Sequence, residues 1–147
     1  MPFEVRLISA AETYDIRWPV LRAGLPRESA IFDGDDASEA RHFGAFRDEN
    51  LVGVTSIFPR PFPDHPERKN TWQLRGMAVV PEVQSQGAGE ALLKAAQIDA
   101  RQNGAECLWA NARVPAARFY EKHGWTIIGS EFDIPTAGPH VRMWIAV

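Results

Sequence analysis

The chain has 147 residues, of which 45% are hydrophobic and 24% are charged, the proportions of an ordinary globular domain. A net charge of −3 gives no reason to expect nucleic acid as a partner, and no apolar run is long enough to span a membrane. Cys107 is the single cysteine, which excludes an intrachain disulfide and favours a reducing, cytoplasmic location. We expect one domain over residues 1–147, with Cys107 buried in a strand.

The N-terminal part of the chain predicts a strand, a helix and a loop. Residues 3–8 alternate apolar and charged side chains, which is typical of a strand. Ser9, with Glu12 three residues later, predicts the start of a helix. Pro19 is expected to kink or restart that helix. Residues 24–39 are rich in acidic side chains and predict a solvated loop with a short helix, or alternatively a cation-attracting wall of a substrate cleft.

The middle of the chain predicts antiparallel strands and a long connection. Residues 42–47 and 51–58 are apolar segments around a polar turn, the pattern of a hairpin. Residues 59–70 are rich in proline and predict a long exposed connection. Residues 71–80 predict the next strand, and Gly76 within it indicates a bulge or a close backbone approach.

A glycine-rich turn at residues 84–89 leads from this strand directly into a helix. Gly87 and Gly89 lack the β-carbons that would keep a ligand away from the backbone. The N-terminus of the following helix carries a partial positive charge that suits a phosphate. The third glycine of the dinucleotide fingerprint and the lysine of a Walker loop are both absent, so neither of those sites is expected.

The C-terminal part of the chain predicts an alternation of helices and strands. The expected elements are the helix that Asn103-Gly104 ends, a strand at residues 106–110, a helix from Pro115 to Gly124, and strands at residues 125–134 and 139–147 joined by a turn at residues 135–138. A strand, a helix and another strand in succession imply a right-handed crossover between parallel strands.

Two segments resemble one family. The loop Gln84-x-x-Gly87-x-Gly89 resembles the acyl-CoA pyrophosphate loop of the GCN5-related N-acetyltransferase (GNAT) family. Residues 111–125, which contain Phe-Tyr-Glu-Lys-His-Gly-Trp, resemble the C-terminal helix signature of that family. The hairpin segment that ends at His140 further resembles the Gly-x-Pro-His-type turn of a poorly characterised bacterial subgroup.

The resemblance implies a fold and a reaction. The fold would be α/β (α+β) in three layers, with a mixed, mostly antiparallel sheet of six or seven strands and helices on both faces. A bulge near Gly76 would splay the fourth strand from the fifth and admit the pantetheine arm of acetyl-CoA. The reaction would transfer an acetyl group directly from acetyl-CoA to a primary amine of a small molecule or a protein.

The resemblance also assigns roles to residues of this chain. The residues implied in binding the cosubstrate are Met77, Ala78, Val79, Gln84, Ser85, Gln86, Gly87, Ala88, Gly89, Glu90, Asn111 and Arg113. Arg113 stands where family members often carry asparagine, so its role stays open between a phosphate contact and a solvated surface position. Tyr120 would be the general acid that protonates the leaving thiolate, and a core aromatic is the alternative.

The acceptor side of the site is less defined. Trp72, Arg75 and His140 are candidate substrate residues, with ordinary strand or hairpin positions as the alternative for each. The general base stays open among His42, Asp36, His140 and a chain of water molecules. No metal is expected, because the histidines do not pair at ligand spacing.

Two other functions stay open at this point: a non-catalytic module that senses acyl-CoA, and an enzyme with a different acyl group. The sequence also does not decide between a monomer and a homodimer.

Overall fold

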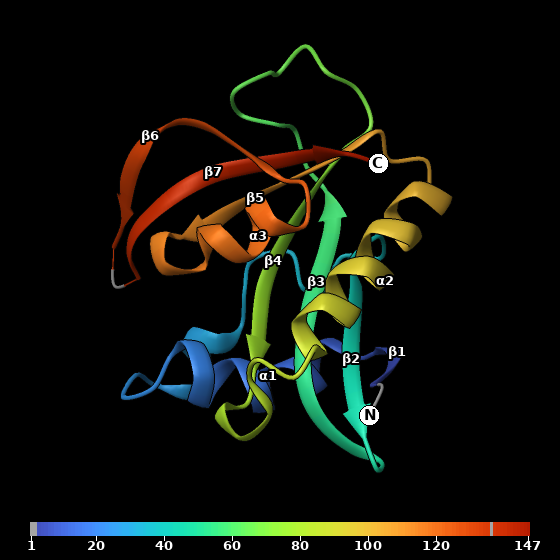
Figure 1. The fold of residues 1–147 in the computed structure, drawn as a ribbon, viewed down its shortest axis with the longest axis vertical. Helices are drawn as coiled ribbons and strands as arrows, with labels where there is room; N and C mark the ends of the chain where they lie inside the picture. The colour runs from blue at the N-terminus through green and yellow to red at the C-terminus, as the bar shows by residue number, and fades with distance from the viewer. Residues whose placement is uncertain (1–2, 136) are drawn as a thin grey trace. The chain divides into compact units, whose positions relative to one another are not determined.

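Within the described residues, 3–135 and 137–147, the computed structural model contains one mixed sheet of seven strands. The strand order is β1-β2-β3-β4-β5-β7-β6 (Figure 1). The strands are β1 (Glu4–Ile8), β2 (Arg41–Arg47), β3 (Asn50–Pro59), β4 (Thr71–Val79), β5 (Cys107–Arg113), β6 (Thr126–Ile134) and β7 (Gly138–Ala146). The helices are α1 (Ala10–Leu21), α2 (Ala88–Gln102) and α3 (Ala117–Lys122), with short 3-10 turns η1 (Arg27–Ala30), η2 (Pro81–Val83) and η3 (Val114–Ala116). Thr136, in the predicted turn at 135–138, lies outside the described residues.

The pairing within the sheet confirms the predicted mixed, mostly antiparallel fold. Antiparallel pairs join β1 with β2, β2 with β3, β5 with β7, and β6 with β7. β4 runs parallel to β5, and this pairing joins Thr71–Gln73 to Cys107–Trp109, upstream of Gly76. β5 extends to Arg113 and is longer than the predicted strand at residues 106–110, because β7 pairs with it along its whole length.

The chain groups into two compact units. The first contains Met1–Phe58 and Leu74–Asp99, and the second contains Pro59–Gln73 and Ala100–Val147. β4 contributes its first residues to the second unit and its remaining residues to the first. Each unit contains a hydrophobic cluster of its own.

The core of the first unit lies on both sides of β3. A β-carbon on Gly53 would lie 3.1 Å from Leu92 of α2, whereas the next residue, Val54, packs with Ile16 of α1 and with Ala78. Since successive side chains of a strand point to opposite faces, α1 and α2 cover opposite faces of β3 (Figure 1). This arrangement confirms the expected helices on both faces of the sheet.

Helix α1 begins at the predicted cap and does not break at its proline. The Ser9 side chain accepts a hydrogen bond from the Glu12 N–H at 3.2 Å, and the Glu12 carboxylate accepts one from the Ser9 N–H at 2.8 Å. The prediction that Pro19 restarts the helix is wrong, because α1 continues to Leu21. Pro19 lies in the last turn, where only a short stretch of helix follows the missing N–H.

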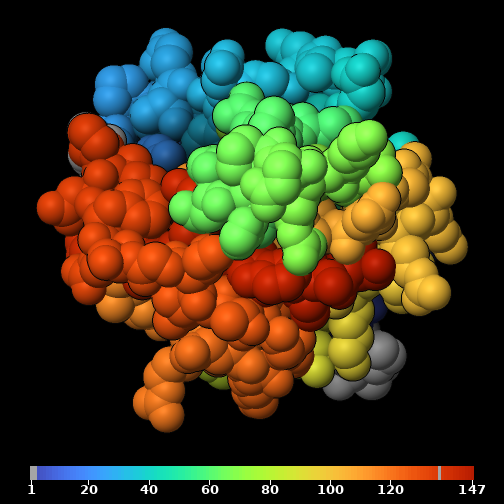
Figure 2. All heavy atoms as spheres, turned by 90° about the horizontal axis from the view of Figure 1, so that it is seen from above, coloured from blue at the N-terminus to red at the C-terminus, as the bar shows by residue number. Residues whose placement is uncertain are grey.

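The core of the second unit includes a residue of the proline-rich connection. Phe62 is fully buried with Cys107 and Trp109, and the Phe62 and Trp109 rings stack with centroids 6.1 Å apart. The proline-rich connection is therefore anchored at Phe62 and is not exposed along its whole length. The large apolar ring of Phe62 is stabilised by burial more than the side chains beside it would be. Figure 2 shows residues 59–70 in green beside the red strand β7, which Asp64 reaches through an ion pair with Arg142 at 2.8 Å.

The remaining predictions concern helix ends and the cysteine. Cys107 is fully buried, as predicted. Gly104 and Gly124 adopt positive φ angles of 90° and 93° after α2 and α3, which confirms the predicted glycine stops. Pro115 lies in η3, and α3 follows from Ala117. No helix in the described part of the chain is long and apolar enough to cross a membrane.

Candidate active site

The glycine-rich turn of the first unit is held in shape by its own side chains. β4 ends at Val79, η2 follows, and α2 begins at Ala88. The Gln84 side-chain amide donates to the Val79 carbonyl at 2.9 Å, and the Gln86 amide donates to the Glu82 carbonyl at 3.2 Å. The two glutamines therefore bind the turn to the residues before it.

The backbone of this turn has the geometry of an anion site. Ser85 and Gly87 have positive φ angles of 66° and 103°. A β-carbon on Gly87 would have no heavy atom within 4 Å, so this side of the turn faces open space. The first N–H groups of α2, a helix of 15 residues, lack partners within the helix and carry its partial positive charge. Such a turn before a helix suits a phosphate or diphosphate.

A positive side chain reaches this turn from the β2–β3 hairpin. The Arg47 guanidinium donates to the Gln86 side-chain oxygen and lies 4.9 Å from the centre of the Phe3 ring. Within the first turn of α2, Glu90 forms an ion pair with Lys94 at 3.5 Å, which offsets its negative charge. Sequence reasoning missed Arg47, since only the folding of the sheet brings the hairpin to the turn.

The strand before the turn contains the predicted distortion. Gly76 has a φ of 69°, a conformation that side chains other than glycine rarely adopt. A β-carbon there would lie 3.0 Å from Arg17 Nε and 3.3 Å from the Phe32 ring. Gly76 is therefore required by both backbone conformation and close approach. Met77, Ala78 and Val79 follow it directly, and Ala78 is buried.

The close neighbour of Gly76 is a buried ion pair that sequence reasoning missed. Arg17 is fully buried, and its NH1 and NH2 groups contact the Asp35 carboxylate at 2.7 and 3.1 Å. Burial alone would raise the pKa of Asp35, but hydrogen bonds and charge from Arg17, with the Phe32 N–H, hold that pKa below its ordinary value. The expectation of a solvated loop is therefore wrong at Asp35, because α1 carries a cation that requires a buried partner.

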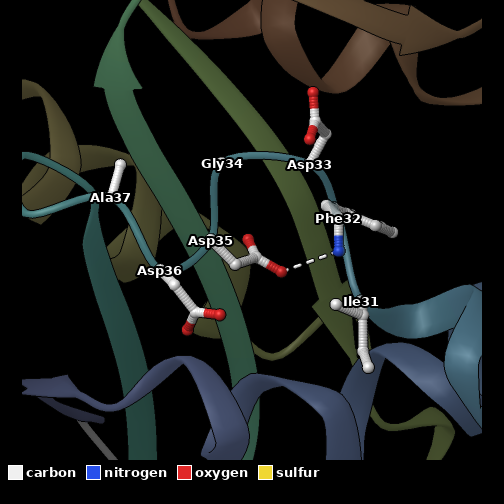
Figure 3. A pocket seen from close by; sticks show the side chains of 7 residues that line it. All are labelled: Ile31, Phe32, Asp33, Gly34, Asp35, Asp36 and Ala37. Atoms are coloured by element: carbon white, nitrogen blue, oxygen red, sulfur yellow. Dashed lines mark hydrogen bonds between the residues drawn. The ribbon is translucent and has the colours of Figure 1, made fainter.

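The other acidic residues of this loop lie in solvent. Residues 31–37 line an open hollow of about 490 Å³ (Figure 3). Asp33 and Asp36 are exposed, whereas the Asp35 carboxylate points back and accepts a hydrogen bond from the Phe32 N–H at 2.7 Å (Figure 3). Asp33 and Asp36 therefore give the hollow two exposed carboxylates, whereas Asp35 is engaged in its ion pair with Arg17.

Two candidate acceptor-side residues of the first unit are engaged by this loop. Arg75 donates to the Asp33 carbonyl, lies 3.5 Å from the Asp35 carboxylate and stacks 4.3 Å from the centre of the Phe58 ring. His42, a candidate base, has both ring nitrogens engaged, one with Ser56 Oγ at 2.6 Å and one with the Asp35 carbonyl at 3.0 Å. Both side chains therefore support the loop.

Tyr120 lies in the second unit, in α3. It is 5% exposed, and its ring centre lies 5.2 Å from those of Phe119 and Trp125. Burial raises the pKa of Tyr120 above its ordinary value. A phenol is protonated at neutral pH even without this shift, and the higher pKa makes Tyr120 a weaker proton donor.

The other candidates of the second unit lie on β4, β5 and β7. Asn111 accepts a hydrogen bond from Arg142 Nε at 2.6 Å, an interaction that sequence reasoning missed. Arg113 ends β5 opposite His140, whose Nδ1 lies 2.8 Å from the Gly138 carbonyl. Trp72 is buried in β4.

Metal ligands do not gather among the residues that the structure describes. No group of three or more His, Cys, Asp and Glu side chains in residues 3–135 and 137–147 could hold a metal ion.

Comparison with known proteins agrees with this geometry. The family model of the acetyltransferase (GNAT) family matches residues 10–125. The chain belongs to the GNAT acetyltransferase family. It is 36% identical over 141 residues, 96% of this chain and 94% of the relative, to the N-acetyltransferase YitI of Bacillus subtilis (strain 168), itself uncharacterized.

Solved structures share the GNAT fold. FeeM, an N-acyl amino acid synthase from uncultured soil microbes, matches with a TM-score of 0.80 at 18% identity, over 99% of this chain and 91% of that one. An aminoglycoside 6'-N-acetyltransferase complexed with coenzyme A matches with a TM-score of 0.77 at 14% identity, over 97% and 96% of the two chains. Membership of the GNAT family supports the use of acetyl-CoA by an N-acyltransferase.

Proposed function

We propose that this GNAT protein transfers an acetyl group from acetyl-CoA to a primary amine of a small molecule or a protein. The observation that carries the proposal is the turn at residues 84–87, where the backbone opens to solvent at Gly87 immediately before the N-terminus of α2. A diphosphate of coenzyme A would accept hydrogen bonds from this backbone, and Arg47 would add a positive charge.

The strand that leads into the turn would hold the rest of the cosubstrate. Met77, Ala78 and Val79 would pair their backbone with the pantetheine arm, in the manner of an added strand. A strand N–H near the Gly76 distortion would donate to the carbonyl oxygen of the thioester as negative charge develops on it. Acetyl-CoA supplies the activated acyl group, and the chain supplies position and charge stabilisation.

The transfer itself would be direct. The nitrogen lone pair of the amine forms a bond to the thioester carbon, and the carbon–sulfur bond breaks. Tyr120 gives its hydroxyl proton to the departing thiolate, the amine nitrogen loses one proton to water, and a proton from water restores the Tyr120 hydroxyl. Tyr120 is proposed for this step because it matches the tyrosine of the family's helix signature, and a phenol is protonated at neutral pH.

Thiol release tests this proposal. The protein is mixed with acetyl-CoA and a panel of small amines and peptides, and free coenzyme A is measured over time. We expect release that depends on both the protein and one class of amine. Binding of acetyl-CoA without thiol release for any amine would instead identify an acyl-CoA-sensing module.

A further inference from the structure

Arg17 occupies a place where a cation is costly. It is fully buried, and removing two charges from water offsets much of what their attraction contributes. Its NH1 group contacts Asp35 and the Ala30 carbonyl, the latter at 3.0 Å. Its NH2 group contacts Asp35 and Ser56 Oγ, the latter at 3.1 Å. A buried ion pair often contributes little net stability. Stability alone therefore does not explain why Arg17 and Asp35 are buried here.

The contacts of Arg17 tie three segments of the first unit together. Arg17 comes from α1, Asp35 from the loop that lines the hollow, and Ser56 from β3. The guanidinium carbon also lies 4.0 Å from the centre of the Phe32 ring. The planar group is therefore fixed by hydrogen bonds at its edge and by an aromatic ring on its face.

The fourth segment that meets Arg17 is β4, at its distorted residue. Arg17 Nε is the atom nearest to the position that a β-carbon on Gly76 would take, 3.0 Å away. Nε has no hydrogen-bond partner among the described residues, although it is buried. The guanidinium thus fills the space beside the strand at the point where the backbone has a φ of 69°.

We propose that Arg17, held by Asp35, is a positioning residue for acetyl transfer that fixes the backbone turn at Gly76. The guanidinium plane leaves one backbone conformation for Gly76 and so sets the direction of the N–H groups of Met77 and Val79. The ion pair between Arg17 and Asp35 also anchors the loop at residues 31–37. The loop that lines the hollow and the part of β4 after Gly76 are therefore held in one arrangement within the first unit. This inference rests on the proposed function, since the strand matters for transfer only if it binds the thioester.

The test compares Arg17→Lys with the matched control Arg27→Gln. Lysine keeps the charge but has neither the planar fork nor the width of a guanidinium. Arg27 also joins its segment to α1, through an ion pair with Asp15 at 3.0 Å, but both side chains are about half or more exposed. For Arg17→Lys we expect kcat to fall by at least about tenfold while acetyl-CoA affinity stays within about threefold, because misplacement near the reacting atoms reduces the rate steeply. Arg27→Gln should keep wild-type values.

A second readout separates this inference from the proposed function. Amide chemical shifts of residues 76–79, measured by NMR, report the strand conformation whether or not an amine is acetylated. We expect Arg17→Lys to shift these amides and Arg27→Gln to leave them unchanged. If the wild type acetylates no amine, the proposed function fails, and the shifts still decide the role of Arg17. Unchanged shifts with wild-type kcat in Arg17→Lys would overturn the inference.

Two milder variants keep the test usable if Arg17→Lys does not fold. Ser56→Ala removes one hydrogen bond from Arg17 and one from His42, and leaves the contact between Arg17 and Asp35. Gly76→Ala does not change Arg17 itself. It adds a β-carbon 3.0 Å from Arg17 Nε, at a residue whose φ of 69° is strained for alanine. Both should shift the amides of residues 76–79 and lower kcat more than acetyl-CoA affinity. Wild-type shifts and kcat in both folded variants would likewise overturn the inference.

Discussion

Two glycines at opposite ends of α2 allow the phosphate site to be tested apart from stability. Gly87 precedes α2 with a φ of 103°, and Gly104 follows it with a φ of 90°. A β-carbon on either residue would have no heavy atom within 4 Å. Gly87→Ala and Gly104→Ala therefore introduce the same backbone strain and no clash, but only one of them lies in the proposed diphosphate site.

The expected losses of stability and of acetyl-CoA affinity follow from this comparison of Gly87 with Gly104. A left-handed conformation costs an alanine roughly 1–2 kcal/mol, so both variants should lose about that much stability. For a chain of this size, each 1 kcal/mol lowers Tm by about 2–4 °C. The new methyl group of Gly87→Ala also projects into the space that the diphosphate would occupy. We expect it to weaken acetyl-CoA binding at least about tenfold, which corresponds to about 1.4 kcal/mol.

Isothermal titration calorimetry measures the acetyl-CoA affinity of both variants, and thermal unfolding measures their stability. We expect the two variants to lose similar stability and only Gly87→Ala to lose affinity. Wild-type affinity in Gly87→Ala would refute the phosphate site at this turn. An equal loss of affinity in Gly104→Ala would show that the effect is strain in α2 and not contact with the ligand.

Three further predictions concern titratable side chains. Tyr120→Phe should lower kcat at saturating substrate by about 10²-fold, the lower end of general acid catalysis, with nearly unchanged acetyl-CoA affinity; unchanged kcat across a pH series would remove Tyr120 from the mechanism. The pKa of Asp35 is lowered in the folded protein, so its ion pair adds stability above about pH 4 that is lost as the pH falls through the folded pKa. Asp35→Asn should therefore cost about 3 kcal/mol or more at pH 7, because it leaves the buried charge of Arg17 without a counter-charge. The difference in chemical denaturation midpoint between the variant and the wild type should narrow as the pH falls below about 4; a constant difference would contradict the assignment. Burial raises the pKa of the Cys107 thiol, so it should react with a thiol reagent only after unfolding; rapid labelling of the native protein would show that Cys107 is accessible.

Local signals in the sequence predicted much of the fold. Ser9 and Glu12 satisfy each other within one turn, and Gly104 and Gly124 stop helices through their own backbone conformations. Gly76 was predicted to mark a distortion because glycine is rare within strands. Each of these effects depends on a few consecutive residues, so a single sequence is sufficient to recognise it.

Long-range contacts were beyond the reach of the same reasoning. Arg17 looks like an ordinary charged residue of a helix, and its partner Asp35 lies 18 residues away in a loop that resembles a solvated one. Phe62 lies among prolines that indicate exposure, yet stacks on Trp109. Arg47 reaches Gln86 from 39 residues away. These contacts exist only after the strands pair, and no spacing along the chain encodes them.

The most direct test of the proposed transfer follows the acetyl group itself. The protein is incubated with acetyl-CoA that carries a deuterated acetyl group and with the amine panel, and the masses of the amines and of the intact protein are measured over time. We predict that one class of amine gains the labelled acetyl mass while the protein never carries it, as direct transfer requires. A labelled protein that later passes its label to the amine would contradict direct transfer, and a panel in which no amine gains the label would contradict the proposed enzyme.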